Sequence, residues 1–206
     1  MNAPRIGQAS IVLHWVSRFA LWVLGWKVQG PRPPFERYVA IFGPHTSYWD
    51  APIAIFMSFV LRVKGNWLGK HTIFRWPFGY LFRAIGGIPV ERSAHHNFVD
   101  EAVRVFAENE RIILALAPEG TRKCTDHWKS GFYHIAVQAK VPIVLAFFDF
   151  ERKLAGNTGV VVYPTGNIEA DLERIQEVYD AITPRHPERR SAVRFRESTP
   201  PARPEE

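Results

Sequence analysis

The stretch that decides the fold is residues 111–117, Arg-Ile-Ile-Leu-Ala-Leu-Ala, followed at once by Pro118-Glu119-Gly120-Thr121-Arg122. A continuous apolar run, closed by a turn that contains proline and glycine, indicates a strand that is buried on both faces. Such strands are typical of parallel sheets, because helices cover both faces of these sheets. The run therefore predicts one strand of an α/β fold, with a polar turn at its carboxyl end.

The rest of the chain alternates between strands and helices around this run. Further strands are expected at residues 38–42, 66–70, 87–91, 141–148 and 159–163, and helices at residues 53–63, 74–85, 98–107, 132–139 and 168–182. Several of these strands are continuously apolar, which indicates burial on both faces. The alternation predicts an α/β fold with a mostly parallel sheet flanked by helices.

The composition is that of a globular domain with a basic surface. The chain has 206 residues, of which 47% are hydrophobic and 22% charged, so it buries a core without disulfides. The single cysteine, Cys124, excludes a disulfide framework and a cysteine-based zinc site within one chain. A formal net charge of +6 favours anionic partners: nucleic acid, anionic lipid or phosphorylated substrates.

The first thirty residues are expected to form an amphipathic helix at a membrane surface. Residues 9–26 are apolar but carry His14 and Arg18, so neither a transmembrane helix nor a signal peptide is predicted. At helical spacing, four aromatic residues form a ridge: Trp15, Phe19, Trp22 and Trp26. Such a ridge suits a bilayer interface. It equally suits a helix that packs its aromatic side chains on the protein core.

The last residues differ from the central part in composition. Residues 184–206 combine prolines with many charges and few apolar side chains, which favours a disordered or loosely attached tail. We therefore expect three segments: an interfacial helix over residues 1–30, the α/β domain over residues 31–183, and this tail, which is either solvated or in contact with anionic lipid.

Residues 43–50, Gly-Pro-His-Thr-Ser-Tyr-Trp-Asp, place a histidine just after a buried strand and a carboxylate five residues later. On a continuous helix five residues turn through about 500°, so His45 and Asp50 meet only if Asp50 opens the next helix. Pro52 supports this start, because proline is tolerated near the beginning of a helix. Asp50 would then hold one imidazole nitrogen and leave the other to take a proton. The alternative is a helix-capping Asp50 beside an ordinary turn histidine.

Two other blocks offer groups that bind phosphate. Residues 86–92, GGIPVER, end a strand with Arg92, and an arginine at the carboxyl end of a strand can bind a phosphate with two hydrogen bonds. In residues 117–122, Gly120 allows a close backbone approach, Thr121 offers a hydroxyl and Arg122 a second guanidinium. Either block alone has a plainer interpretation: a solvated arginine, or a turn with Glu119 paired to Arg122.

Four blocks in this order, HTSYWD, GGIPVER, APEGTR and VPIVLA, resemble the glycerolipid acyltransferase family, typified by the 1-acylglycerol-3-phosphate acyltransferases. The resemblance spans residues 38–148. It implies transfer of an acyl chain from acyl-CoA or acyl carrier protein to the hydroxyl of a lysophospholipid, above all 1-acyl-glycerol-3-phosphate, in phospholipid biosynthesis.

The resemblance also implies roles for individual residues. His45 would be the general base and Asp50 its orienting partner. Lys70 resembles a basic residue that the family carries before its second block. The implied substrate-binding residues are Lys70, Arg92, Glu119, Gly120, Thr121 and Arg122.

The expected partners follow from this chemistry. They are the acyl thioester, the lysophospholipid and an anionic membrane surface, with acyl carrier protein as an alternative donor; no nucleic acid, metal or cofactor is expected. The enzyme is expected at the cytoplasmic face as a peripheral or monotopic membrane protein. Two alternatives stay open: the same chemistry on an amino-acid lipid or glycolipid, and a basic lipid-binding protein without catalysis.

Overall fold

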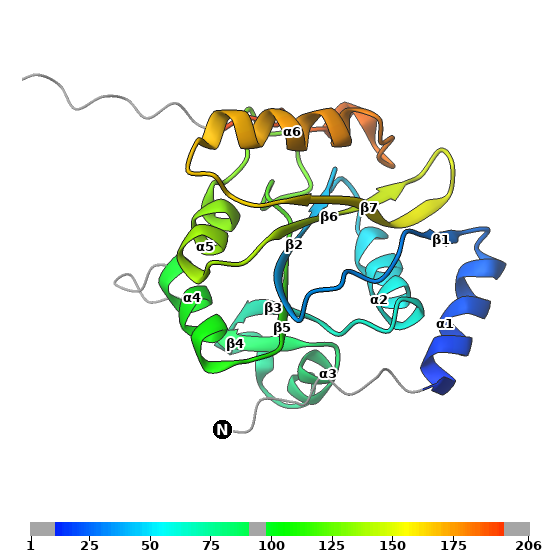
Figure 1. The fold of residues 1–206 in the computed structure, drawn as a ribbon. Coiled ribbons are helices and arrows are strands. Elements are labelled where there is room, and N and C mark those ends of the chain that lie inside the picture. The colour runs from blue at the N-terminus through cyan, green and yellow to red at the C-terminus, as the bar shows by residue number, and fades with distance from the viewer. Residues whose placement is uncertain (1–10, 91–97, 196–206) are drawn as a thin grey trace, which may run out of the picture.

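A computed structural model describes residues 11–90 and 98–195. Within them a seven-stranded sheet runs in the order β1-β7-β6-β2-β5-β3-β4 (Figure 1). The strands are β1 (Lys27–Gln29), β2 (Arg37–Gly43), β3 (Gly65–Lys70), β4 (Gly87–Val90), β5 (Ile112–Leu116), β6 (Ile143–Asp149) and β7 (Leu154–Val162). Neighbouring strands are parallel except β6 and β7, which are antiparallel. The predicted α/β fold with a mostly parallel sheet is confirmed.

Helices cover both faces of this sheet. They are α1 (Ile11–Val23), α2 (Asp50–Val60), α3 (Gly79–Ala84), α4 (Phe98–Glu108), α5 (Gly131–Ala139) and α6 (Ile168–Asp180), with short 3-10 helices η1 (His71–Phe74) and η2 (Pro187–Arg189). The helices α4, α5 and α6 enclose the largest hydrophobic core on one face. On the other face, α1 and α2 pack over β6 and β7.

The central strands are apolar throughout because both of their faces are covered. In β2, Val39 and Ile41 belong to the large core, whereas Tyr38 and Ala40 point to the opposite face. The apolar run at residues 111–117 contains β5, which lies between β2 and β3. The carboxyl ends of these three parallel strands therefore lie at one edge of the sheet.

The helix expected over residues 74–85 is only half formed. A 3-10 turn ends at Phe74 and the α-helix begins at Gly79. Pro77 has no N–H for a helical hydrogen bond, and the chain comes so close at Gly79 that a Cβ there would collide with the carbonyl oxygen of Phe74. The rings of Phe74 and Phe82 pack against Trp67 and against each other.

The N-terminal helix packs inward through the face that carries His14, Ser17 and Leu21. Ser17 and Leu21 are buried, and the Nδ1 atom of His14 lies 3.4 Å from the carbonyl oxygen of Phe59 on α2. The aromatic side chains that face outward are Trp15, Phe19 and Trp22, with 59%, 64% and 71% of their surface exposed. The alternative in which this ridge packs on the core is wrong for these three residues, and the membrane-surface role stays a prediction.

The residues after α1 belong to the domain, which corrects the predicted boundary at residue 30. The helix ends at Val23, so Trp26 leaves the ridge and is buried against Phe150. The strand β1 that follows pairs with β7. No helix in the described part of the chain is long and apolar enough to cross a bilayer.

The C-terminal segment, which we define as residues 184–195, is packed on the domain, so the prediction of a loosely attached tail is wrong there. Val193 joins the large core, and Trp128 donates its backbone N–H to the carbonyl oxygen of Arg194 at 2.7 Å. Arg190 donates at 2.6 Å to the carbonyl oxygen of Tyr179 near the end of α6, where a cation is favoured. Arg190 and Arg194, two of the charged residues that suggested disorder, thus donate hydrogen bonds to backbone carbonyl oxygens. Residues 196–206 lie outside the described part.

Candidate active site

His45 and Asp50 meet at the carboxyl end of β2. The strand ends at Gly43, and Asp50 is the first residue of α2. The Nδ1 atom of His45 lies 2.8 Å from the Oδ2 atom of Asp50, and the side chains are 17% and 1% exposed, respectively. Ser47 donates its backbone N–H to the same oxygen at 3.1 Å. The predicted turn-to-helix geometry is confirmed, and the positive end of α2 stabilises the carboxylate charge.

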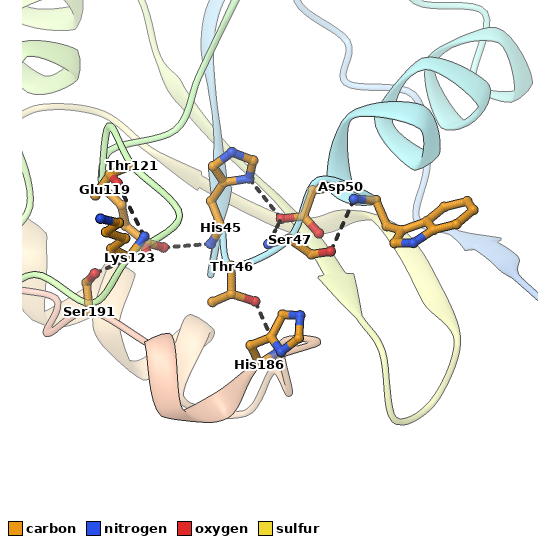
Figure 2. Close-up of polar contacts among 10 residues, drawn as sticks. His45, Thr46, Ser47, Asp50, Glu119, Thr121, Lys123, His186 and Ser191 are labelled. Carbon is orange, nitrogen blue, oxygen red and sulfur yellow. Dashed lines mark hydrogen bonds and ion pairs between the residues drawn. The ribbon is translucent and has the colours of Figure 1, made fainter.

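The contact with Asp50 decides how the imidazole presents its second nitrogen. A carboxylate only accepts hydrogen bonds, so it holds the proton on Nδ1 and leaves Nε2 as the basic atom. Figure 2 shows this second nitrogen turned away from Asp50. The arrangement can accept a proton at Nε2 and stabilise the resulting imidazolium.

Glu119 faces the protein interior, which differs from its predicted place in the substrate-binding site. The residue is 2% exposed. The Oε1 atom accepts the backbone N–H of His45 at 2.6 Å, and the Oε2 atom accepts the hydroxyl of Ser191 at 3.1 Å (Figure 2). Burial raises the pKa of Glu119, and the two donors oppose that rise. The predicted contact between Glu119 and the substrate is not supported, because both carboxylate oxygens already accept hydrogen bonds from the protein.

Arg122 stacks on an aromatic ring next to the histidine turn. Its Cζ atom lies 4.1 Å from the centroid of the Tyr48 ring, and its Nε atom is buried without a hydrogen-bond partner in the structure. The predicted alternative of a Glu119–Arg122 ion pair is wrong, because Glu119 binds His45 and Ser191 instead. A buried guanidinium N–H without a partner favours an oxygen-rich ligand at this position.

The other residues of this block shape the turn. Gly120 is exposed and has φ of +64°, which glycine adopts without strain, and a Cβ there would press on Lys129. The Oγ1 atom of Thr121 accepts the backbone N–H of Lys123 at 3.3 Å. Both residues thus lie in the turn after β5, at the sheet edge that also carries His45.

Two predicted residues are described only in part or not at all. Lys70 is the last residue of β3, in register with Val90 at the end of β4, but its side chain lies outside the described part. Arg92 also lies outside it, within residues 91–97. No group of three or more His, Cys, Asp or Glu side chains in residues 11–90 and 98–195 is arranged to hold a metal ion.

Sequence reasoning missed the contribution of the C-terminal segment to this site. Ser191 bonds to Glu119, and the backbone N–H of His186 donates to the Oγ1 atom of Thr46 at 3.2 Å (Figure 2). Both contacts join residues that are 72 or more positions apart in the chain. A local pattern carries no signal for either of them.

The sequence model of the acyltransferase family matches residues 27–146, more than half of the chain. The chain belongs to the acyltransferase family. This match confirms the resemblance drawn from the four blocks, and the matched range contains His45, Asp50, Glu119 and Arg122. It ends before the C-terminal segment.

Named acyltransferases are similar to this chain. The 1-acyl-sn-glycerol-3-phosphate acyltransferase of Cocos nucifera is 32% identical over 149 residues, covering 68% of this chain and 47% of its own length. The protein of that name from Limnanthes douglasii is 30% identical over 149 residues, covering 68% and 51%. The chain therefore spans about half the length of these relatives.

A solved acyltransferase structure has the same fold. It is the crystal structure of the 1-acyl-sn-glycerophosphate (LPA) acyltransferase PlsC from Thermotoga maritima. The match has a TM-score of 0.58 at 17% identity, and it covers 82% of this acyltransferase-family chain and 75% of PlsC. At this identity the likeness bears on the fold alone.

Proposed function

We propose that the protein is an O-acyltransferase that moves an acyl chain from an acyl thioester to the hydroxyl of lysophosphatidate (1-acyl-glycerol-3-phosphate). The observation that carries the proposal is the contact between His45 Nδ1 and Asp50 Oδ2 at 2.8 Å, beside a turn that bears Arg122, in a chain of the acyltransferase family. The names of the relatives support lysophosphatidate as the acceptor.

The chemical step uses His45 as a general base. Its Nε2 atom takes the proton of the acceptor hydroxyl while the oxygen attacks the carbonyl carbon of the thioester. Asp50 stabilises the imidazolium that forms. When the tetrahedral intermediate collapses, the carbon–sulfur bond breaks, and the imidazolium returns the proton to the leaving thiolate. The step needs no covalent acyl-enzyme and no metal ion.

We assign the acceptor phosphate to the part of the site that carries Arg122. Arg122 has a buried Nε atom without a partner, which a phosphate oxygen would satisfy. Gly120 and Thr121 border it in the same turn, and Lys70 and Arg92 complete the set that we assign to the acceptor. Glu119 is left out of the substrate contacts and assigned to the support of the His45 turn.

The acceptor is a lipid, so we propose that the enzyme works at a membrane surface as a peripheral or monotopic protein on the cytoplasmic side, in phospholipid biosynthesis. Acyl-CoA or acyl carrier protein supplies the acyl chain. The exposed aromatic side chains of α1 support this location.

The test is an acyl-transfer assay with the purified chain. Labelled acyl-CoA or acyl carrier protein is incubated with a panel of lysolipids that includes lysophosphatidate, a lyso-glycolipid and an amino-acid lipid. We expect labelled phosphatidate as the main product. A labelled glycolipid or amino-acid lipid instead would move the acceptor to the alternatives. If no product formed while vesicles still bound the protein, a lipid-binding role without catalysis would replace the proposal.

A further inference from the structure

The C-terminal segment reaches the catalytic turn through a chain of hydrogen bonds. Ser191, which is buried, donates its hydroxyl to the Oε2 atom of Glu119 at 3.1 Å. The other oxygen of that carboxylate accepts the backbone N–H of His45 at 2.6 Å. A single carboxylate therefore connects Ser191 to the residue that carries the imidazole (Figure 2).

Besides Glu119, the Ser191 hydroxyl has Thr125 as a hydrogen-bonding neighbour. Thr125 donates its backbone N–H to the Oγ atom of Ser191 at 3.1 Å, and its own hydroxyl lies 2.9 Å away. An ionised carboxylate only accepts hydrogen bonds, so the single proton of Ser191 goes to Glu119.

Ser191 is also held in place from both sides along the chain. Arg190 bonds to the end of α6, and the backbone of Arg194 accepts a hydrogen bond from Trp128. Removing the Ser191 hydroxyl therefore leaves the segment anchored. The hydroxyl oxygen also accepts the N–H of Thr125, so it is one attachment of the segment among several.

We propose that Ser191 is a positioning residue, which acts through Glu119 to fix the backbone of His45 and so the imidazole relative to the acceptor hydroxyl. The inference rests on the proposed function for its catalytic consequence, but the contact itself does not depend on it. Ser191 lies outside the region matched by the family model, which ends at residue 146.

The physical reason is that a charged acceptor makes the stronger hydrogen bond. Burial raises the pKa of Glu119, which favours its neutral form, whereas the donors from His45 and Ser191 favour the ionised form. If the Ser191 hydroxyl is lost, the pKa of Glu119 rises further and a larger fraction is protonated at a given pH. The His45 N–H then loses its charged acceptor, and the turn loosens.

The experiment compares Ser191→Ala with a control in the same segment, Arg194→Ala, which removes an exposed guanidinium bonded to the carbonyl oxygen of Asp126. For Ser191→Ala we expect kcat to fall roughly 10-fold or more, the range of a lost hydrogen bond to a charged group. The KM values for the acyl-CoA donor and the lysophosphatidate acceptor should stay unchanged. Arg194→Ala is expected to keep both kcat and KM.

A second readout needs no activity. In ¹⁵N-labelled protein the amide proton of His45 follows the charge of Glu119 as pH is lowered. We expect the midpoint of that titration at higher pH in Ser191→Ala than in the wild type or in Arg194→Ala. Ser191→Cys, which keeps the size of the side chain with a weaker donor, gives an intermediate midpoint and serves if the alanine variant fails to fold.

Three results would overturn the proposal: an unchanged kcat, a parallel change in kcat and KM, or an unchanged midpoint of the His45 amide. A wild-type protein without acyl transfer would contradict the proposed function. The amide titration would still decide whether Ser191 acts on His45.

Discussion

At the scale of the residue, the proposed chemistry depends on the imidazole of His45. In His45→Ala no group remains to take the proton of the acceptor hydroxyl, so kcat is expected to fall by about 10²–10⁴-fold, the usual contribution of a general base. The site lies at the surface end of β2, so the fold is expected to persist. The matched control is His134→Ala, because His134 is exposed on α5. Near-normal turnover in His45→Ala would contradict the assignment.

Asp50→Asn tests the carboxylate separately from the imidazole. The amide keeps the shape of the side chain and can still accept the N–H of Ser47, but it removes the charge that stabilises the imidazolium. We expect a loss of kcat with little change in the KM for either substrate. Steady-state assays at several pH values measure this, and an effect confined to the acceptor KM would assign Asp50 to binding.

Arg122→Ala addresses the acceptor phosphate. A lost charge-assisted hydrogen bond costs about 1.5–3 kcal/mol, so the KM for lysophosphatidate should rise by roughly 10- to 100-fold while the KM for acyl-CoA changes little. Arg111→Ala is the control, since Arg111 lies in an exposed ion pair with Glu36. Equal effects on both substrates would contradict the phosphate site. Arg92→Ala, assayed in parallel, is expected to behave like Arg122→Ala.

At the scale of single residues, the sequence predicted only contacts between residues that are close together in the chain. The meeting of His45 and Asp50 followed from a strand, a turn and a helix start within a few residues. The direction of Glu119 did not follow, because neighbouring residues of a turn point either inward or outward. Its partner Ser191 lies 72 positions away in a stretch whose composition suggested disorder.

At the scale of the element, the hydroxyl of Tyr179 forms hydrogen bonds between α6 and the central strands. Tyr179 is fully buried, and its hydroxyl lies 2.9 Å from the carbonyl oxygen of Ile41 in β2 and 3.0 Å from that of Ala146 in β6. The register of β6 against β7 is irregular between Val144 and Ala146. The tyrosine therefore supplies a donor where the sheet ladder is interrupted.

Tyr179→Phe should lower the free energy of unfolding by about 1–3 kcal/mol, because it removes a buried donor that two backbone carbonyl oxygens share. Urea denaturation measures the change. Tyr163→Phe is the control, since Tyr163 is exposed, and it is expected to alter stability by less than about 0.5 kcal/mol. Equal stability of the two variants would show that the Tyr179 hydroxyl contributes nothing.

Elements were predictable from sequence where one pattern dominated. The apolar runs at β2, β5 and β6 indicated strands with both faces covered, and all three lie in the middle of the sheet. Pairing partners were not predictable in the same way. The short strand β1 pairs with a segment more than 100 positions away, and the antiparallel direction of β7 depends on a register that no local pattern specifies.

At the scale of the whole molecule, the exposed large apolar side chains of the described residues include two groups. One lies on the outer face of α1. The other surrounds η1 and α3, and its members are Ile73, Trp76, Phe78, Tyr80 and Leu81. Residues 61–90 contain five Lys or Arg and no acidic residue. Aromatic rings mixed with cations suit the boundary between lipid headgroups and acyl chains.

The last prediction is that the protein binds anionic bilayers from one side through α1. Each Lys or Arg near the surface adds about 1 kcal/mol, a part that salt screens. Deleting residues 1–30 is a poor test, because it removes the buried Leu21 and Trp26 and the strand β1. Point variants avoid this problem, since Trp15, Phe19 and Trp22 are exposed.

Vesicles of phosphatidylcholine mixed with phosphatidylglycerol should co-sediment the wild type, and high salt should release part of it. The triple variant Trp15→Ser, Phe19→Ser and Trp22→Ser should remain in solution with an unchanged melting temperature. Val137→Ser is the control, because Val137 is exposed on α5, which covers the opposite face of the sheet from α1. If the triple variant bound as well as the wild type, α1 would not be the contact. If alkaline carbonate failed to extract the wild type, α1 would lie deeper than the interface.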